Sequence, residues 1–431
     1  MRRYFIVATA LIFIFLLLSG GTPWSFGVSE ARAQGWEAVV AADPNGPSLF
    51  LGIDKDSQEL YLFSQQSPLT VSDRFACTTG ESPGDKFEEG DLKTPEGVYF
   101  IKSRLDSGLD YELYGNRAYT LNFPNPIDRM KGKTGSGIWL HGRGHDIVPR
   151  ETKGCIAMNN PDLEGMEDIL VPGTPVLVAK SLQWTEGQDQ DPESLELAQR
   201  VMDWANAWSE QSEEFFSFYD AENYPAAQGE SFTVFENHKQ NLFRTLKWIR
   251  VKPYNLHILR GPDYWVTWFE QLYLSSGLRT EGIKRLYWQK GPDGVMRIVG
   301  KEWIGATLGL EEKYLEEVTN DMALVVESWR KAWEQADLAE YMRFYDENAS
   351  QAGRYGAQAI QDQKKALWQE KKPTRVGIKN IEVSFHPTGL QVSFIQEYSD
   401  ETHYSDTGRK TLVFRPAGDG WAIVSENWSS M

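Results

Sequence analysis

The chain has 431 residues, of which 61 are acidic and 44 are basic, so its formal charge at pH 7 is −17. This length is enough for two to four domains with ordinary hydrophobic cores. The acidic balance argues against nucleic acid as a partner, because binding to phosphates requires clustered Lys and Arg. A soluble, self-repelling surface explains the same charge without any special function, and we give that interpretation the greater weight.

The first 33 residues predict an export signal. Met1 to Arg3 is a basic start, Tyr4 to Leu18 is an apolar run, and Ala31-Arg32-Ala33 is a small-x-small cleavage site. The apolar run is shorter than the roughly 20 residues of a membrane-spanning helix, although an uncleaved anchor stays open. We therefore expect an exported protein of the periplasm or cell envelope, cleaved after Ala33.

Short β-rich segments between residues 47 and 180 predict one mostly-β domain. Turn residues separate these segments, and no long helical pattern lies between them. One short helix is expected at Asn160-Pro161, and its positive end would favour a thiolate at Cys155. The predicted strands are Leu49–Ile53, Glu59–Phe63, Gly97–Ile101, Ala118–Leu121, Gly137–Leu140 and Pro175–Val178.

A histidine and a cysteine in this domain form a candidate acyl-transfer site. His141 and Cys155 lie 14 positions apart, each beside a glycine and near apolar residues that predict strands. A thiolate is the nucleophile in cysteine chemistry, and a nearby imidazole can generate it. Gly154 allows a close backbone approach, so that its amide and that of Cys155 could stabilise an oxyanion. The alternative is structural: a disulfide between Cys155 and Cys77, which are the two cysteines of the chain.

The segment Thr152-Lys153-Gly154-Cys155, preceded by His141-Gly142, resembles the signature of the YkuD-type L,D-transpeptidase family. The resemblance implies that Cys155 is the nucleophile and that His141 is its proton acceptor and donor. It also implies that the Gly142 carbonyl orients the imidazole, that Thr152 helps to hold the cysteine loop, and that Gly154 contributes to the oxyanion hole. Upstream, Gly84-Asp85-Lys86 together with residues 90–99 resembles the family's G-D-x-x-T-P-x-G stretch.

Several further residues are candidates for substrate binding. Many family members have histidine where this chain has Lys153, and a lysine ammonium near the thiol would favour the thiolate and change what the pocket accepts. Arg143 either pairs with a substrate carboxylate or is a solvated loop charge. Tyr99 could line the substrate site, as could Thr152, whereas His145 is expected on the intervening loop rather than at the base position.

An internal repeat follows a polar linker expected at residues 181–194. Trp204-x-x-Ala207-Trp208 recurs 125 positions later as Trp329-x-x-Ala332-Trp333, and other aromatic residues recur at nearly the same offset. Each copy, over residues 195–305 and 318–431, shows helices followed by three or four β segments. This order resembles the α+β cone of nuclear transport factor 2-like (SnoaL-like) domains. The histidines His238, His257, His386 and His403 do not recur at this offset and are expected to be structural or surface residues.

The resemblances together imply an exported, cysteine-dependent enzyme of peptidoglycan. It would form a thioester with the L-centred third residue of a stem peptide and transfer it to an amine, and no metal or organic cofactor is needed. Transfer to water would make it an L,D-carboxypeptidase that trims tetrapeptide stems, as in the cell-shape branch of the family. A non-catalytic wall-binding protein is the alternative from another class. The repeats would serve packing, homodimerisation or docking on a cell-wall or morphogenesis protein.

Overall fold

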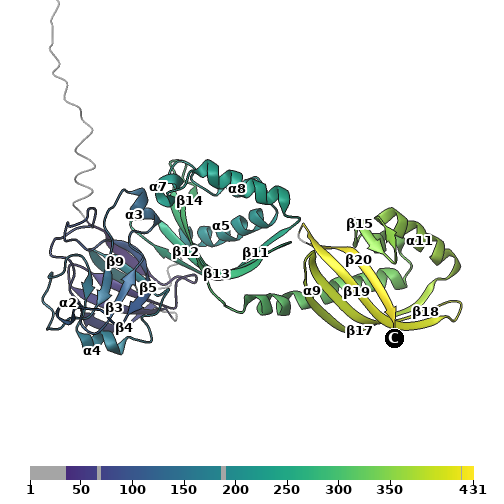
Figure 1. The fold of residues 1–431 in the computed structure, drawn as a ribbon, viewed down its shortest axis with the longest axis horizontal. Coiled ribbons are helices and arrows are strands. Elements are labelled where there is room, and N and C mark those ends of the chain that lie inside the picture. Colours follow the sequence, from purple (N-terminus) through teal and green to yellow (C-terminus); the bar gives the residue numbers. More distant parts are fainter. Residues whose placement is uncertain (1–34, 66–68, 186–190, 419) are drawn as a thin grey trace, which may run out of the picture.

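The structure, a computed structural model, describes residues 35–431 apart from 66–68, 186–190 and 419. A β-rich N-terminal domain is followed by two α+β domains, which we call cone 1 and cone 2, along an elongated molecule (Figure 1). The export signal predicted for residues 1–33 lies outside the described residues. Of the helices described, none is both long and apolar enough to cross a bilayer.

The N-terminal domain is built on an eight-stranded mixed sheet with the order β4-β3-β2-β9-β5-β6-β7-β8. A separate parallel pair, β1 and β10, packs over one of its faces. The strands are β1 (Glu37–Ala41), β2 (Leu49–Asp54), β3 (Glu59–Gln65), β4 (Leu69–Ala76), β5 (Gly97–Leu105), β6 (Ala118–Leu121), β7 (Trp139–His141), β8 (Ile156–Ala157), β9 (Pro175–Ala179) and β10 (Ser181–Thr185), and the helices are α2 (Tyr111–Tyr114), α3 (Pro126–Met130) and α4 (Asn160–Gly165).

Strand β9 shows why the sheet has two cores. All five of its residues are buried. Val176 and Val178 belong to the core on one face of the sheet, whereas Leu177 and Ala179 belong to the core on the other face. Successive side chains of a strand point to opposite faces, so a continuous apolar run is expected where both faces are covered.

The predicted linker at 181–194 is shorter than expected. Residues 181–185 form β10, which pairs in parallel with β1, and helix α5 already begins at Pro192. Leu182 is buried, and the Trp184 ring packs 4.9 Å from the ring of Tyr61. Two apolar side chains on one face of a five-residue segment thus anchor it to the domain, although the neighbouring residues are polar.

The two cones each fold a curved sheet around helices (Figure 1); the sheet of cone 1 is antiparallel, and that of cone 2 is antiparallel except for the parallel pair β15 and β20. Cone 1 has a four-stranded sheet in sequence order, and cone 2 has a six-stranded sheet with the order β16-β15-β20-β19-β18-β17. Cone 1 comprises α5 (Pro192–Ser209), α6 (Glu214–Ser217), α7 (Tyr224–Gln228), α8 (Phe232–Thr245), β11 (Ile249–Arg260), β12 (Trp265–Ser275), β13 (Arg279–Lys290) and β14 (Met296–Gly305). Cone 2 comprises α9 (Leu310–Glu334), α10 (Leu338–Met342), β15 (Tyr345–Gln351), β16 (Arg354–Tyr355), α11 (Ala357–Glu370), β17 (Pro373–His386), β18 (Gly389–Asp400), β19 (Ser405–Ala417) and β20 (Gly420–Ser430).

The sequence repeat corresponds to a repeated core. In cone 1 the Trp204 Nε1 atom donates to Tyr219 Oη over 3.1 Å, and in cone 2 Trp329 Nε1 donates to Tyr345 Oη over the same distance. The tryptophan pairs that open each copy have ring centroids 5.2 Å apart in both cones. The prediction of a mostly-β domain followed by two α+β cones is therefore confirmed.

Cone 1 is packed firmly against the N-terminal domain. A buried apolar cluster contains residues of both, among them Val98 and Phe100 of β5 and Trp268 of β12. The Val98 amide donates to Tyr264 Oη over 2.8 Å, and the Arg285 guanidinium lies over the Phe100 ring at 3.8 Å. Buried apolar area of this kind favours a fixed orientation of two domains.

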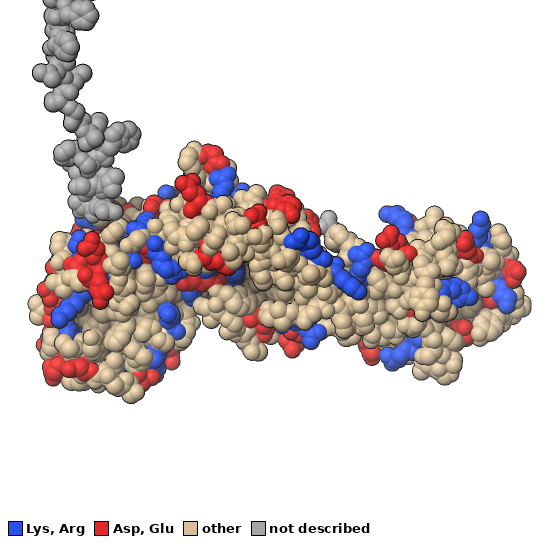
Figure 2. Space-filling model, turned by 45° about the horizontal axis from the view of Figure 1, so that its top comes forward, with Lys and Arg blue, Asp and Glu red and all other residues tan. Residues whose placement is uncertain are grey.

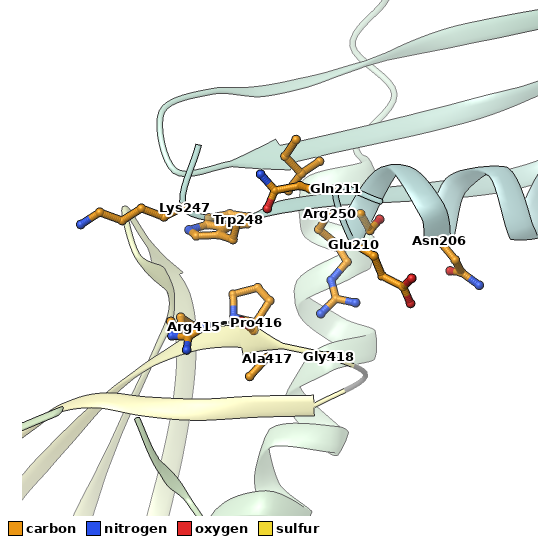
Figure 3. Close-up of a pocket in the computed structure, with 12 residues that line it drawn as sticks. Asn206, Glu210, Gln211, Lys247, Trp248, Arg250, Arg415, Pro416, Ala417 and Gly418 are labelled. Atoms are coloured by element: carbon orange, nitrogen blue, oxygen red, sulfur yellow. Dashed lines mark hydrogen bonds between the residues drawn. The ribbon is translucent and has the colours of Figure 1, made fainter. Parts of the chain in front are cut away.

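The joint between the cones has an apolar part and a polar pocket. Trp248, Leu272 and Leu274 of cone 1 belong to the same buried cluster as the core of cone 2. Trp248 and Arg250 face Arg415 and Pro416 across a pocket of about 340 Å³ (Figure 3). Acidic and basic side chains are interspersed over the face that Figure 2 shows. This pattern is the one expected of a soluble surface with excess negative charge.

Candidate active site

The sheet places His141 and Cys155 on the same face at its β8 edge. Strand β7 pairs in parallel with β8, so that Leu140 lies beside Ile156 and His141 beside Ala157. Leu140 and Ile156 are fully buried in the core. Because side chains alternate along a strand, His141 and Cys155, each next to one of these residues, point to the opposite face. The structure therefore places the predicted pair on one face of the sheet, where the Cys155 thiol donates to the Gly137 carbonyl over 3.5 Å.

His141 is held as a neutral imidazole with one defined tautomer. Its side chain is buried, and burial lowers its pKa to about 4. Its Nδ1 atom lies 2.6 Å from the Gly142 carbonyl oxygen. A carbonyl oxygen can only accept, so Nδ1 carries the proton and the lone pair is on Nε2. This is the form of histidine that can accept a proton from a thiol.

Cys155 rests as a thiol rather than a thiolate. It is partly exposed, yet the surrounding protein raises its pKa, and the charges that oppose this shift belong to Arg143 and Lys86. The exposed Lys153 is not among them, so the predicted thiolate-favouring role of Lys153 is not what the structure shows. The expected helix is present as α4, and its influence on the thiol stays a prediction. Desolvation outweighs these charges because burial penalises the ionised sulfur.

The cysteine loop is fixed by two threonines. Thr152 Oγ1 donates to the Cys155 carbonyl over 2.7 Å and accepts from the Gly154 amide over 3.1 Å. Thr94, from the upstream block, donates to the same carbonyl over 3.5 Å and accepts from the Gly80 amide over 2.9 Å. The loop-holding role predicted for Thr152 thus has a specific geometry, and its hydroxyl is used within the protein rather than turned to a substrate.

Gly154 is required by the backbone at this turn. Its φ is +127°, and a Cβ atom there would lie 2.7 Å from the Lys93 carbonyl oxygen. A residue with a side chain is excluded on both counts. Because the Gly154 amide already donates to Thr152, its contribution to an oxyanion hole stays a prediction that requires this bond to be shared or opened.

A clamp around Gly142 positions the histidine. Asn160 Nδ2 donates to the Arg143 carbonyl over 2.6 Å, and Asn160 Oδ1 accepts from the Asn116 amide over 3.2 Å. The Gly142 amide donates to the Arg117 carbonyl over 3.1 Å. These contacts fix the backbone on both sides of the carbonyl that holds the His141 ring.

Two predicted substrate residues have other roles. Tyr99 is fully buried, and its hydroxyl contacts the Glu96 carbonyl and Asp128, so it is a core residue and not a substrate-lining one. Arg143 is buried, and its guanidinium donates to the carbonyls of Leu113 and Glu151. Both alternatives for Arg143, a substrate carboxylate partner and a solvated loop charge, are therefore corrected to a loop-holding role. His145 is exposed and follows β7, as the sequence predicts.

The cysteines are not joined. Cys77 is free and buried in the core of the domain, and Cys155 is free as well. Burial raises the pKa of the Cys77 thiol far above its usual range, which makes it an inert side chain. Within the described part of the chain, no group of three or more His, Cys, Asp or Glu side chains is arranged to hold a metal ion.

The sequence patterns missed four residues that shape the site. Tyr114 of α2 packs its ring edge-on against His141 at 5.1 Å, Asn160 clamps the Gly142 segment, Thr94 holds the cysteine carbonyl, and the buried Lys86 acts on the thiol. Tyr114, Thr94 and Lys86 are distant in the sequence from His141 and Cys155, whereas Asn160 follows Cys155 by five positions. The G-D-x-x-T-P-x-G resemblance covers the stretch that holds Thr94 and Lys86, and it was the available signal.

Comparisons with known proteins agree with this architecture. Residues 50–178 match the L,D-transpeptidase catalytic domain family YkuD, and residues 196–302 and 321–427 each match the Cds6 C-terminal NTF2-like domain. YafK of Escherichia coli K12, whose name places it among the L,D-transpeptidases, is 32% identical over 136 residues, which cover 31% of this chain and 50% of YafK. The chain thus spans about half the length of the curated relatives it matches.

Solved structures add two relatives. Bd1075 of Bdellovibrio bacteriovorus is 27% identical with a TM-score of 0.50, over 62% of this chain and 96% of that one. The helical cell shape determining protein Pgp2 of Campylobacter jejuni is 25% identical with a TM-score of 0.48, over 59% of this chain and 91% of that one. On the family matches, the chain consists of a YkuD-family L,D-transpeptidase catalytic domain followed by two Cds6 C-terminal NTF2-like domains.

Proposed function

We propose that this protein is an exported, cysteine-dependent acyltransferase that acts on peptidoglycan stem peptides. Cys155 is the nucleophile, His141 is the proton acceptor and donor, and the acyl group comes from the L-centred third residue of the stem. The observation that carries the proposal is the placement of a neutral His141 and the Cys155 thiol on one face of the sheet, within a domain of the YkuD family. Export is inferred from the sequence of residues 1–33.

The resting state supports a proton transfer that is coupled to attack. Both groups are neutral at pH 7, since burial lowers the pKa of His141 and raises that of Cys155. As sulfur bonds to the carbonyl carbon, the thiol proton moves to His141 Nε2, and the carbonyl oxygen becomes an oxyanion held by backbone amides. Collapse of this intermediate breaks the C–N bond, and the imidazolium gives its proton to the departing amine. A thioester remains on Cys155.

The group that attacks the thioester determines which reaction the enzyme catalyses. An amine of a neighbouring stem attacks the thioester to form a cross-link, which is transpeptidation. Water attacks it to leave a tripeptide stem, which is L,D-carboxypeptidase action, and cleavage of a lipoprotein link follows the same chemistry. In each case the nucleophile loses a proton to His141 and Cys155 recovers its thiol. The exposed Lys153 beside the loop is the residue that we expect to influence this choice.

The test is mass spectrometry of tetrapeptide muropeptides after incubation with the chain lacking residues 1–33. Cys155→Ala is the inactive variant, and Cys77→Ala is the matched control, because Cys77 is the other cysteine and lies buried in the same domain. Tripeptides that depend on Cys155 but not on Cys77 identify a carboxypeptidase, and Cys155-dependent dimers identify a transpeptidase. If tetrapeptides stay intact with the protein that retains both cysteines, the tetrapeptide donor is wrong, and cleavage of a lipoprotein link or non-catalytic wall binding replaces it.

A further inference from the structure

Cone 2 contains a pocket of about 390 Å³ between α11 and the sheet. Its floor is formed by buried polar residues, Lys364, Gln396, Lys410 and Glu426. The ring of Trp333 packs beside them, and the more exposed Asp406 lies nearer the opening. Pockets that combine aromatic walls with a few polar groups are the usual form of a small-molecule site.

Lys364 is a buried cation without a carboxylate in direct contact, among the residues that the structure describes. It is 6% exposed, and its Nζ atom lies over the rings of Trp333 at 4.5 Å and Tyr341 at 5.2 Å. Among the residues that the structure describes, its ammonium makes no hydrogen bond or ion pair. Burial lowers its pKa to about 8, so the amine is still largely protonated at neutral pH. An ammonium that contacts ring faces alone leaves its three donors for a ligand.

Glu426 makes no hydrogen bond to Lys364, among the residues described, because other donors already contact its carboxylate oxygens. Its carboxylate is 2.5 Å from Lys410 Nζ, and it accepts from Gln351 Nε2 over 2.6 Å and from the Tyr345 hydroxyl. Lys410 and Glu426 thus balance each other. The charge of Glu426 also acts on Lys364 and raises its pKa, although no hydrogen bond or ion pair joins the two side chains within the described ranges. Two buried ammonium groups thus share one carboxylate, which leaves one positive charge uncompensated.

Acceptors without partners lie in the same pocket. Gln396 is 3% exposed, and its Oε1 atom has no hydrogen-bond partner within the described ranges. Asp406 Oδ1 is buried without a partner as well, while Oδ2 accepts from Tyr404 over 3.3 Å. A buried acceptor without a hydrogen bond destabilises the protein, and a donor on a ligand would remove this cost by forming the missing bond.

Cone 1 lacks this arrangement. Burial lowers the pKa values of Lys239, Lys284 and Lys301, and the charge of Lys301 lowers those of Lys239 and Lys284 further, whereas Glu230 raises that of Lys301. Lys301 stands two residues before Trp303, as Glu426 stands two before Trp428, and Thr280 occupies the ladder position of Asp406. The same frame therefore carries a lysine and a threonine in cone 1 where cone 2 has the carboxylates of Glu426 and Asp406.

We propose that the pocket of cone 2 binds a small zwitterion, an amino acid or short peptide with free amino and carboxyl ends. Its carboxylate contacts Lys364, and its ammonium group donates to Asp406 and Gln396. The aromatic walls pack against the apolar part of the ligand. This inference does not depend on the reaction proposed for Cys155.

Isothermal titration calorimetry tests the proposal with three probes that differ only in end charge. Alanyl-alanine carries both charges, N-acetyl-alanyl-alanine carries only the carboxylate, and alanyl-alaninamide carries only the ammonium. The protein is the chain lacking residues 1–33 with Cys155→Ala, so that no turnover contributes heat. We expect alanyl-alanine to bind about tenfold or more tightly than either single-charge probe, since each lost contact involves a charged group.

Variants locate the site. Lys364→Met and Asp406→Asn should each weaken alanyl-alanine binding about tenfold, whereas Lys239→Met, at the equivalent position of cone 1, should leave it unchanged. The thermal unfolding midpoint of each variant shows whether it is folded, and Asp406→Asn, near the opening, covers the case in which Lys364→Met does not fold. Three results would overturn the proposal. The N-acetyl probe could bind as tightly as alanyl-alanine, or Lys239→Met could abolish binding. Alanyl-alanine could also fail to bind at tens of millimolar, which corresponds to a binding free energy of only a few kcal/mol. Activity of Cys155 is tested separately, so the two proposals can fail independently.

Discussion

Substitution of Gly142 by alanine tests how the histidine is positioned. The φ of Gly142 is not in the left-handed region, so backbone strain does not account for the glycine. Instead, a Cβ atom would lie 1.9 Å from Asn160 Oδ1 and 3.1 Å from Asn160 Cγ. Either the clamp or the backbone must then move by about 1 Å, because protein interiors are close-packed.

The magnitude follows from the displaced contacts. Overpacking of this kind costs about 1–3 kcal/mol of stability. The Gly142 carbonyl holds His141 Nδ1, and a displacement of about 1 Å at a catalytic group costs about a hundredfold in rate. We therefore expect Gly142→Ala to lower kcat/KM for muropeptide turnover about a hundredfold and to lower the free energy of unfolding measured in urea.

A double-mutant cycle distinguishes the clash from other causes. Asn160→Ala alone removes hydrogen bonds of 2.6 and 3.2 Å, which is worth about 1–3 kcal/mol. In Gly142→Ala/Asn160→Ala the clashing atoms are gone, so this double variant should be more active and more stable than Gly142→Ala. Gly165→Ala is the matched control, since a Cβ at this helical glycine meets open space. Wild-type activity and stability in Gly142→Ala, or simple additivity in the cycle, would refute the clamp.

Four further outcomes are expected. His141 is buried as a neutral group, and its pKa is lowered from 6.5 to about 4. Its contribution to stability is therefore complete above pH 6.5 and is lost as the pH falls towards 4. The thermal unfolding midpoint should drop more in this range for the wild type than for His141→Gln. Turnover should also cease as the pH falls through about 4, because imidazolium cannot accept the thiol proton, and a constant rate below that pH would contradict this. Arg285→Ala removes the ion pair of 3.1 Å with Glu302 at the domain interface, while Tyr287 and Asn122 still donate to this carboxylate. The variant should lower the free energy of unfolding in urea by about 1–3 kcal/mol; an unchanged value would show that apolar packing alone holds cone 1. Tyr219→Phe should lower the free energy of unfolding by about 1 kcal/mol. Tyr345→Phe should lower it by about 2–3 kcal/mol, because the Tyr345 hydroxyl also contacts a buried carboxylate. Equal decreases in thermal unfolding experiments would contradict this difference.

The sequence by itself determined the elements whose signals are local. Alternating apolar residues predicted the strands around His141, and the repeated tryptophan pattern predicted two cones with the same core. The Thr-Lys-Gly-Cys loop and His141-Gly142 were sufficient to propose the reacting pair, because their chemistry depends on residue type and on a short spacing. The strand β10 was missed because Leu182 and Trp184 are its sole strong apolar signals in a polar stretch.

Only the tertiary structure decided how these groups are tuned. Whether Lys153 or Lys86 acts on the thiol depends on which side chain the fold turns inward, and burial is the outcome of contacts between distant segments. Tyr99 could not be recognised as a core residue until the position of its strand was known. The clamp on Gly142 comes from Asn160, whose place at the start of a short helix was predicted but whose hydrogen bond to the Arg143 carbonyl was not. The pairing of lysines with carboxylates inside the cones likewise depends on which side chains the fold brings into contact. Distances between residues that are far apart in the sequence cannot be predicted from residue order alone.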